Sequence, residues 1–235
     1  MKIEVLFHQA CGLYGDGKNP VYLQKTLPDA EFIYTDITKT PYFAENDPDM
    51  IMIGSMSENM QRRVIEKLRP YKERISELID KGTVILATGN AGEIFTKKIT
   101  YLTEKTEIEG LGIFDLEVKN DLFKRYNGKV IGTVDGITVV GFRSQFSFIY
   151  GDNLSCGLIK VERGVGINKE SKIEGMRKNN LICTSLLGPL LPLNPLFCEY
   201  IVSLAGEKCV AAYKDAAMDA YNQRVKEFKD PSVKF

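Results

Sequence analysis

The first residues whose types and spacing could do chemistry form a glycine-rich loop near the N-terminus. Residues 12–19 read G-L-Y-G-D-G-K-N, which fits the phosphate-loop pattern G-x-x-x-x-G-K-[ST] except at its last position. That pattern needs a Ser or Thr hydroxyl on the magnesium ion and successive backbone N–H groups turned toward the phosphates. Asn19 has no hydroxyl and Pro20 has no backbone N–H, whereas Asn followed by Pro is a favourable helix start. The sequence favours a loop and a helix capped by Asn19 over a nucleotide site.

A second candidate is a sharp strand-to-helix turn. Residues 83–93 read T-V-I-L-A-T-G-N-A-G-E. Such a turn forces one residue toward positive φ, aims its side chain out of the carboxyl edge of the sheet and points the following N–H groups at an oxyanion. Gly89 and Asn90 fit this geometry but offer no nucleophile, and a Thr88 hydroxyl would need an adjacent base. The pattern alone favours an ordinary tight turn.

The small number of histidines and the arrangement of cysteines limit which catalytic pairs and metal sites the chain can form. His8 is the only histidine, so any Cys–His or Ser–His pair would have to use it. The cysteines are odd in number and lack a C-x-x-C pair, which argues against a disulfide framework and against a zinc site. They are Cys11, Cys156, Cys183, Cys198 and Cys209. We expect reduced thiols, no metal and no cofactor.

Strands and helices that could position these residues alternate through the first hundred positions. Strands are predicted at residues 2–8, 31–37, 50–53 and 83–87, and residues 58–81 predict one helix or a helix broken at Pro70. This alternation implies parallel strands joined by crossover helices.

The pattern changes in the second half of the chain. Residues 130–134 and 137–142 flank Asp135-Gly136, which suits a type I′ hairpin turn and predicts an antiparallel flank. Further strands are expected at residues 158–162 and 180–185, and closing helices at 195–204 and 208–229. The last helix has an apolar face that we assign to core packing ahead of a partner interface. This face consists of Val210, Tyr213, Ala217, Ala220, Tyr221 and Val225. We expect an α/β domain at residues 1–205 and a helical extension at 206–235 packed on it.

Charge and hydropathy exclude several classes of function. Thirty-one basic residues balance thirty-one acidic ones, so overall charge favours neither nucleic acid nor an anionic membrane. Residues 1–7 place Glu4 within an apolar run, which indicates a buried strand and not a signal peptide. Residues 181–197 contain three prolines and cannot supply the roughly 20 continuous apolar residues of a membrane helix. We expect a soluble, cytoplasmic protein that binds neither nucleic acid nor membrane.

Three short motifs, read together, resemble those of a known protein family. Residues 185–195 read S-L-L-G-P-L-L-P-L-N-P, residues 13–19 contain L-Y-G-D-x-x-N, and residues 110–115 read G-L-G-I-F-D. In this order and spacing they resemble the class I glutamine amidotransferase family, in the branch of cobyric acid synthase and the glutaminase subunit of lipid II isoglutaminyl synthase. The resemblance implies a three-layer, flavodoxin-like α/β fold, whose mostly parallel sheet has an antiparallel flank.

The family's catalytic residues do not carry over to this sequence. That family hydrolyses glutamine with a cysteine in an elbow of the form I-C-G-G-Y-Q and with a histidine immediately before the G-P-L-L turn. An ungapped alignment places Gly89 at the cysteine and Glu93 at the glutamine of this elbow, and a shift of one residue places Asn90 at the cysteine. The histidine position falls on Leu187, which can neither activate a nucleophile nor protonate leaving ammonia.

The segments that would shape the family's pocket differ as well. G-F-E-N-H-G-G is replaced by G-F-R-S-Q-F-S at residues 141–147, and the glycine-rich loop after the third strand is reduced to G-S-M-S at 54–57. Cys183 lies near the histidine position, but without a nearby histidine we interpret it as a small buried residue. The remodelled pocket is expected to involve Gly54, Ser55, Thr88, Gly89, Asn90, Glu93, Gln145 and Leu187.

The sequence therefore predicts a glutamine amidotransferase-like protein without glutaminase activity that serves as a binding or partner subunit. In the active relatives the glutaminase delivers ammonia to a Mur-ligase-like synthetase of cell-wall synthesis, so the resemblance implies such a partner. The alternative is a phosphate- or nucleotide-binding enzyme that uses the Gly12–Asn19 loop or the Gly89-Asn90 turn.

Overall fold

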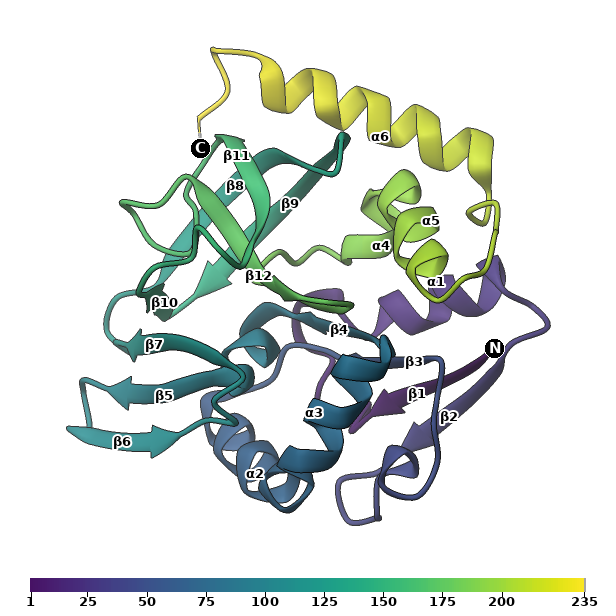
Figure 1. Cartoon of the computed structure of the whole chain (residues 1–235). Helices are drawn as coiled ribbons and strands as arrows, with labels where there is room; N and C mark the ends of the chain where they lie inside the picture. The colour runs from purple at the N-terminus through teal and green to yellow at the C-terminus, as the bar shows by residue number, and fades with distance from the viewer. Residues whose placement is uncertain (235) are drawn as a thin grey trace.

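A computed structural model of the chain describes residues 1–234. It contains a nine-stranded mixed sheet with helices on both faces, and a separate four-stranded sheet (Figure 1). This architecture confirms the predicted three-layer α/β class with a mostly parallel sheet and an antiparallel flank.

Five neighbouring strands of the large sheet are parallel, in the order β2-β1-β3-β4-β13. They are β1 (Lys2–Leu6), β2 (Glu31–Thr35), β3 (Met50–Ile53), β4 (Val84–Thr88) and β13 (Leu181–Thr184). The predicted strands match these within two residues at each end. Because the strands are parallel, the segments that follow β1, β3, β4 and β13 leave the sheet at one edge, and these segments carry the predicted site residues.

The antiparallel flank continues the sheet in the order β12-β11-β8-β9. These strands are β12 (Ile173–Lys178), β11 (Gly157–Arg163), β8 (Tyr126–Val134) and β9 (Ile137–Gln145). Asp135 and Gly136 join β8 to β9 with φ of 46° and 82°, so both residues are left-handed, as a type I′ turn requires. The predicted hairpin is confirmed.

Helices cover both faces of the large sheet. On one face, α1 (Lys18–Thr26), α4 (Leu190–Leu193) and α5 (Pro195–Leu204) pack over apolar side chains such as Leu86 and Ile182. On the other face lie α2 (Glu58–Leu68) and α3 (Lys72–Lys81). A 3₁₀ turn at Arg69–Tyr71 separates these two helices, which confirms the predicted break at Pro70.

The four-stranded sheet was not predicted. Its order is β10-β7-β5-β6, formed by β5 (Thr96–Tyr101), β6 (Thr106–Glu109), β7 (Phe114–Asn120) and β10 (Ser147–Tyr150). Its buried side chains, including Ile99 and Val118, belong to the core that α2 and α3 also cover. The two sheets therefore share one hydrophobic core.

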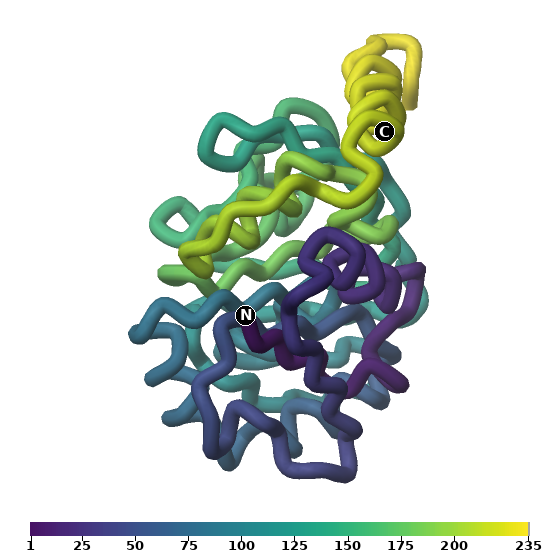
Figure 2. The backbone as a smooth tube through the Cα atoms, turned by 90° about the vertical axis from the view of Figure 1, so that its right-hand side faces the viewer, coloured from purple at the N-terminus to yellow at the C-terminus, as the bar shows by residue number. Residues whose placement is uncertain are grey.

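The last helix, α6, begins at Lys214 and ends at Lys229, so the predicted start at residue 208 is wrong. Before it the chain has no regular secondary structure, and two of its N–H groups are engaged by side chains: Ala211 donates to Glu199 and Ala212 donates to Thr26. Figure 2 shows α6 at the outer edge of the molecule. Its side chains Tyr221 and Phe228 pack on β8 and β9 through a small apolar cluster. The division of the chain at residue 205 stays a prediction.

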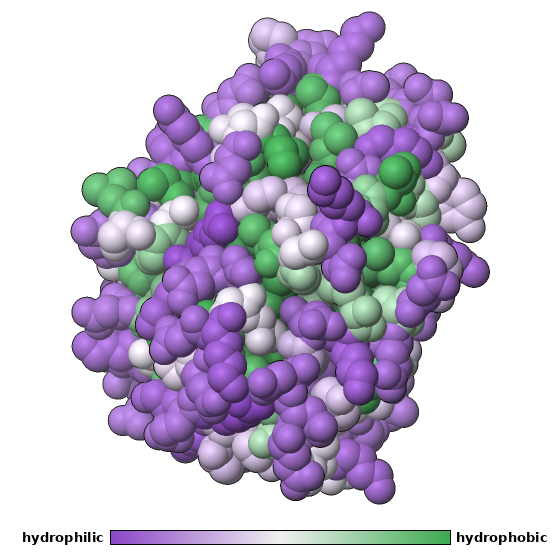
Figure 3. Space-filling model, turned by 45° about the vertical axis from the view of Figure 1, so that its right-hand side comes forward, coloured by the Kyte–Doolittle hydropathy of each residue, from purple (hydrophilic) through white to green (hydrophobic). Residues whose placement is uncertain are grey.

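The predicted apolar face of this segment is only partly buried. Tyr221 is 6% exposed, whereas Val210 and Tyr213 are 69% and 70% exposed, so their assignment to core packing is wrong. Both residues lie before α6, where the spacing of a helical face no longer applies. On the side of the molecule seen in Figure 3 the lower half is largely hydrophilic, and hydrophobic side chains show mainly in the upper half. Within residues 1–234 no helix is both long enough and apolar enough to cross a membrane.

Candidate functional site

The turn after β4 has the backbone geometry of an elbow. Gly89 begins a short 3₁₀ helix, Gly89–Phe95, and has a φ of 62°, a left-handed conformation that glycine adopts without steric cost. Asn90 follows Gly89 within this 3₁₀ helix. This geometry favours the ungapped alignment, in which Gly89 takes the position of the family's nucleophile.

Two side chains fill the space in which a nucleophile at Gly89 would lie. A Cβ on Gly89 would be 2.6 Å from Cβ of Ser55 and 2.9 Å from Cδ2 of Leu187. Both distances are shorter than van der Waals contact permits. Ser55 comes from the loop after β3 and Leu187 from the segment after β13, which is held against β9 by two backbone hydrogen bonds to Phe142, of 2.8 and 3.2 Å. The elbow is therefore closed by one residue of the loop after β3 and one residue of the segment after β13.

Backbone donors beside the elbow are also engaged. The N–H of Ser55 donates to Oδ2 of Asp16 at 2.9 Å, and the N–H of Met56 donates to Oδ1 of Asn90 at 2.9 Å. Nδ2 of Asn90 donates in turn to the carbonyl of Met56 at 2.8 Å. An oxyanion hole needs free N–H groups aimed at the developing negative charge. Here side chains of the protein occupy these donors.

A cavity of about 190 Å³ lies above the elbow and is lined by five of the eight predicted residues. They are Ser55, Gly89, Asn90, Gln145 and Leu187. Gly54 and Thr88 instead line a separate cavity of about 170 Å³, which also contains His8. Oγ1 of Thr88 donates to Asp16 at 2.8 Å, so this hydroxyl is engaged with a buried carboxylate.

Glu93 lines neither of these two cavities and is 5% exposed. Its carboxylate accepts hydrogen bonds from Oγ of Ser147 and from Nε2 of Gln61, the latter at 2.8 Å. Gln61 accepts in turn from the hydroxyl of Tyr101 at 3.0 Å. Burial raises the pKa of Glu93 to about 7, although the bonds from Ser147 and Gln61 act in the opposite direction. A buried acid thus replaces the neutral glutamine that the resemblance implies here.

The motif residues near the N-terminus act as buried connectors. Asp16, 2% exposed, accepts from Ser55 and Thr88 and also from Nδ2 of Asn19 at 3.1 Å. Burial raises the pKa of Asp16, and these hydrogen bonds partly oppose that effect. Oδ1 of Asn19 accepts from the N–H of Leu191 at 2.9 Å. The prediction that Asn19 caps α1 is wrong, because the helix begins at Lys18 and the Asn19 side chain instead links α1 to α4.

The Gly12–Asn19 loop does not form a phosphate cradle. The N–H groups of Leu13, Asp16 and Asn19 donate to the carbonyls of Ser55, Leu13 and Asp16, at 2.9 to 3.1 Å. The carboxylate of Asp16 also lies within this segment and would repel a phosphate. The preference for a plain loop over a nucleotide site agrees with these contacts.

Cys183 is enclosed in the core and is fully buried. Burial raises its pKa well above the usual value of a thiol, which disfavours the thiolate that nucleophilic attack requires. The interpretation of Cys183 as a small buried residue is confirmed.

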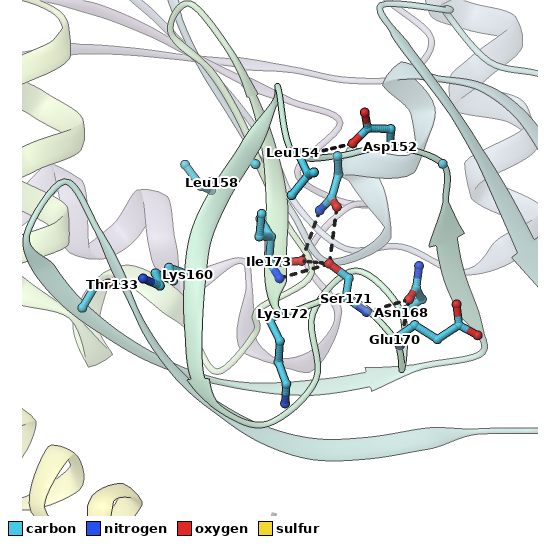
Figure 4. Close-up of a pocket in the computed structure, with 13 residues that line it drawn as sticks. Thr133, Asp152, Leu154, Leu158, Lys160, Asn168, Glu170, Ser171, Lys172 and Ile173 are labelled. Atoms are coloured by element: carbon cyan, nitrogen blue, oxygen red, sulfur yellow. Dashed lines mark hydrogen bonds between the residues drawn. The ribbon is translucent and has the colours of Figure 1, made fainter.

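A wider hollow of about 660 Å³ lies on the antiparallel flank (Figure 4). Its polar side chains bond mainly to the loop itself: Oγ of Ser171 lies 3.3 Å from Oδ1 of Asn153 and 3.1 Å from the carbonyl of Ile173, and Oδ1 of Asn168 accepts two N–H groups. These contacts stabilise the loop between β11 and β12. The hollow contains none of the predicted site residues.

Sequence reasoning missed Gln61 and Ser147, which hold Glu93, and it assigned no role to Asp16. Asp16 had a signal, because it lies in the quoted L-Y-G-D motif. Ser147 ends the quoted segment at residues 141–147, but nothing in that segment pointed to Glu93. Gln61 had no signal, because it belongs to no spacing pattern and approaches Glu93 only through the packing of α2.

Comparison with solved structures defines the fold of this chain. No model of a known protein family matches the chain. A crystal structure of a glutamine amidotransferase superposes with a TM-score of 0.55 at 14% identity, covering 87% of this chain and 99% of that one. The glutaminase domain of Trypanosoma brucei CTPS with bound acivicin gives 0.54 at 9% identity, covering 91% and 97%. The fold is that of the class I glutamine amidotransferases.

Sequence comparison narrows this class to a family. The GatD subunit of lipid II isoglutaminyl synthase (glutamine-hydrolyzing) from Staphylococcus aureus is 30% identical over 200 residues, which cover 83% of this chain and 80% of that protein. The GatD subunit from Streptococcus pneumoniae is 25% identical over 214 residues, covering 88% and 81%. The chain belongs to the family of these GatD subunits, which confirms the resemblance found in its motifs.

Proposed function

We propose that this chain is a glutamine amidotransferase-like subunit without glutaminase activity. The observation that carries the proposal is the closed elbow, in which a Cβ at Gly89 would lie 2.6 Å from Ser55 and 2.9 Å from Leu187. Two requirements of thiol-dependent amide hydrolysis are unmet together: a nucleophile and a base beside it. Their positions hold Gly89 and Leu187, and the nearby N–H groups of Ser55 and Met56 are engaged by side chains.

The proposed role is that of a partner subunit in the cytoplasm. Its GatD relatives are subunits of a lipid II isoglutaminyl synthase. By analogy with them, a Mur-ligase-like synthetase of cell-wall synthesis is the partner that we propose. This chain would contribute binding surface to that complex.

Ammonia release from glutamine tests the proposal. The purified chain is assayed alone and with the synthetase, and the Staphylococcus aureus GatD subunit with its own synthetase serves as the positive control. We expect no release above the protein-free blank in either arm, because Gly89 supplies no thiol and Leu187 supplies no base. Turnover by this chain at a rate comparable to the control would sink the proposal.

The closed elbow makes a second prediction, about stability. Gly89→Cys should lower the free energy of unfolding by about 1–3 kcal/mol for the left-handed backbone alone, and by more because the new Cβ meets Ser55. Adding Ser55→Gly should recover the stability lost to the steric contact with Ser55, but not the stability lost to the left-handed backbone. Urea unfolding measures both variants against the wild type and Ser55→Gly alone. If Gly89→Cys were as stable as the wild type, the elbow would not be closed.

The nucleotide-binding alternative predicts magnesium-dependent binding of ATP that Lys18→Ala weakens, since Lys18 would reach the phosphates. Isothermal titration measures the heat of ATP binding to the wild type and to Lys18→Ala. We expect no binding heat that depends on Lys18, because the N–H groups of Leu13, Asp16 and Asn19 are already bonded to carbonyls.

A further inference from the structure

A groove on the four-stranded sheet carries more positive than negative charge. It has a volume of about 360 Å³ and adjoins the elbow cavity, with which it shares Phe146. Its charged lining residues are Lys119, Lys124, Arg125 and Lys169 with Asp121 and Glu170. We call this site the basic groove.

One ion pair neutralises part of this charge. Nζ of Lys124 lies 3.1 Å from Oδ2 of Asp121. Within residues 1–234, Lys119, Arg125 and Lys169 form no ion pair with a carboxylate, and Glu170 forms none with a cation. The basic groove therefore has a surplus of two positive charges. Because the chain as a whole is neutral, this surplus is a local feature and not a consequence of composition.

Aromatic rings position the three unpaired cations. Nζ of Lys119 lies 4.9 Å from the ring centroid of Tyr150, Cζ of Arg125 lies 5.0 Å from that of Phe146, and Nζ of Lys169 lies 5.9 Å from that of Phe148. A ring face attracts a cation but accepts no strong hydrogen bond from it. Apart from one bond from Arg125 to the hydroxyl of Tyr14, the N–H donors of these cations stay available to a ligand.

A fourth cation lies behind the rings. Arg143 is 1% exposed, and its Cζ lies 5.7 Å from the ring centroid of Phe148 and 6.0 Å from that of Tyr126. Its Nη2 is buried and has no hydrogen-bond partner among residues 1–234. The buried carboxylates Glu93 and Glu174 offset part of its charge. The guanidinium of Arg143 still adds positive potential to the basic groove, whose wall here consists of the rings of Tyr126 and Phe148. A charged groove with low-dielectric walls attracts anions more strongly than an open surface does.

From this arrangement we propose that the basic groove binds a compact anion with two or more negative charges, either a phosphate or a carboxylate compound. One negative group would lie between Lys119 and Lys169, and Arg125 would hold a second toward the elbow cavity. The proposal does not rest on the absence of glutaminase activity, because none of these residues contacts Gly89, Ser55 or Leu187 in the elbow.

Isothermal titration of the full chain at low ionic strength tests the proposal, with inorganic pyrophosphate and citrate as probes in the absence of magnesium. We expect saturable binding of at least one probe. Binding of pyrophosphate alone would identify a phosphate compound as the ligand class, and binding of citrate alone a carboxylate compound. Failure of both probes to bind would overturn the proposal.

A pair of double variants locates the binding. Lys119→Ala/Lys169→Ala should weaken binding of the responding probe by about tenfold or more, since two nearby charges are lost. Lys39→Ala/Lys226→Ala removes the same net charge from exposed positions outside the groove and should change affinity by less than about twofold. Equal effects of the two double variants, or none from the first, would contradict the proposed site.

Discussion

Glu93 shows how one residue can alter a site without touching its cavity. The family pattern places a neutral glutamine here, whereas this chain holds a carboxylate that accepts hydrogen bonds from Ser147 and Gln61. Because the group is buried, its protonation is coupled to folding.

The raised pKa of Glu93 predicts a pH-dependent stability that Glu93→Gln removes. The folded-state pKa of about 7 exceeds the ordinary 4.5, so the folded chain binds the extra proton between these values. The stabilisation from that proton is complete below pH 4.5 and is lost as pH rises through 7. Between pH 5 and 8 the wild type should therefore lose about 2–3 kcal/mol relative to Glu93→Gln.

Urea unfolding at several pH values measures this difference. Glu66→Gln, on the exposed face of α2, is the matched control and should follow the wild type across the whole range. A constant gap between wild type and Glu93→Gln would show that Glu93 does not take up a proton in this window.

At the scale of elements, strands and turns with strong local patterns were predictable. β3 and α5 match their predicted bounds, and the Asp135-Gly136 turn has the expected geometry. The four-stranded sheet was missed although β7 alternates buried Phe114, Leu116 and Val118 with polar residues. That period-two signal was present in the sequence. The start of α6 had no such signal, because it depends on contacts of residues 211 and 212 with Glu199 and Thr26.

Two tyrosines that share the predicted apolar face should respond differently to substitution. Tyr221→Ala removes a ring that packs on β8 and β9 and a hydrogen bond of 2.8 Å to the carbonyl of Thr138, and should cost about 3 kcal/mol of unfolding free energy. Tyr213→Ala, at a position 70% exposed, should change stability by less than about 0.5 kcal/mol. Thermal or urea unfolding of both variants checks this; equal losses would show that α6 does not pack as described.

For the whole molecule, the motifs predicted the family and the fold but not the closure of the elbow. The spacing of L-Y-G-D-x-x-N and G-P-L-L-x-x-N-P was informative because Asn19 bonds Leu191 in the folded chain. The lack of space for a side chain at residue 89 was unpredictable. Ser55 and Leu187, which fill that space, are distant in sequence and meet only at the edge of the assembled sheet.

The four-stranded sheet shares its hydrophobic core with the large sheet. This shared core predicts that both sheets unfold in one transition. The chain has no tryptophan, so Tyr34→Trp in β2 and Tyr150→Trp in β10 each introduce a single fluorescent reporter at a partly exposed site. Both fluorescence midpoints in urea should coincide with each other and with the loss of far-ultraviolet circular dichroism. Separate midpoints for the two reporters would mean that the smaller sheet unfolds independently.

The contact of Gly89 with Ser55 and Leu187 also bears on descent. Under the proposed function, one mutation would not restore a working thiol, because a cysteine at residue 89 would first have to be accommodated and would still lack a histidine. At least two further changes, at Ser55 and Leu187, would be needed before selection could act on catalysis. Under the proposed function, the packed elbow means that recovery of glutaminase activity would require more substitutions than its loss.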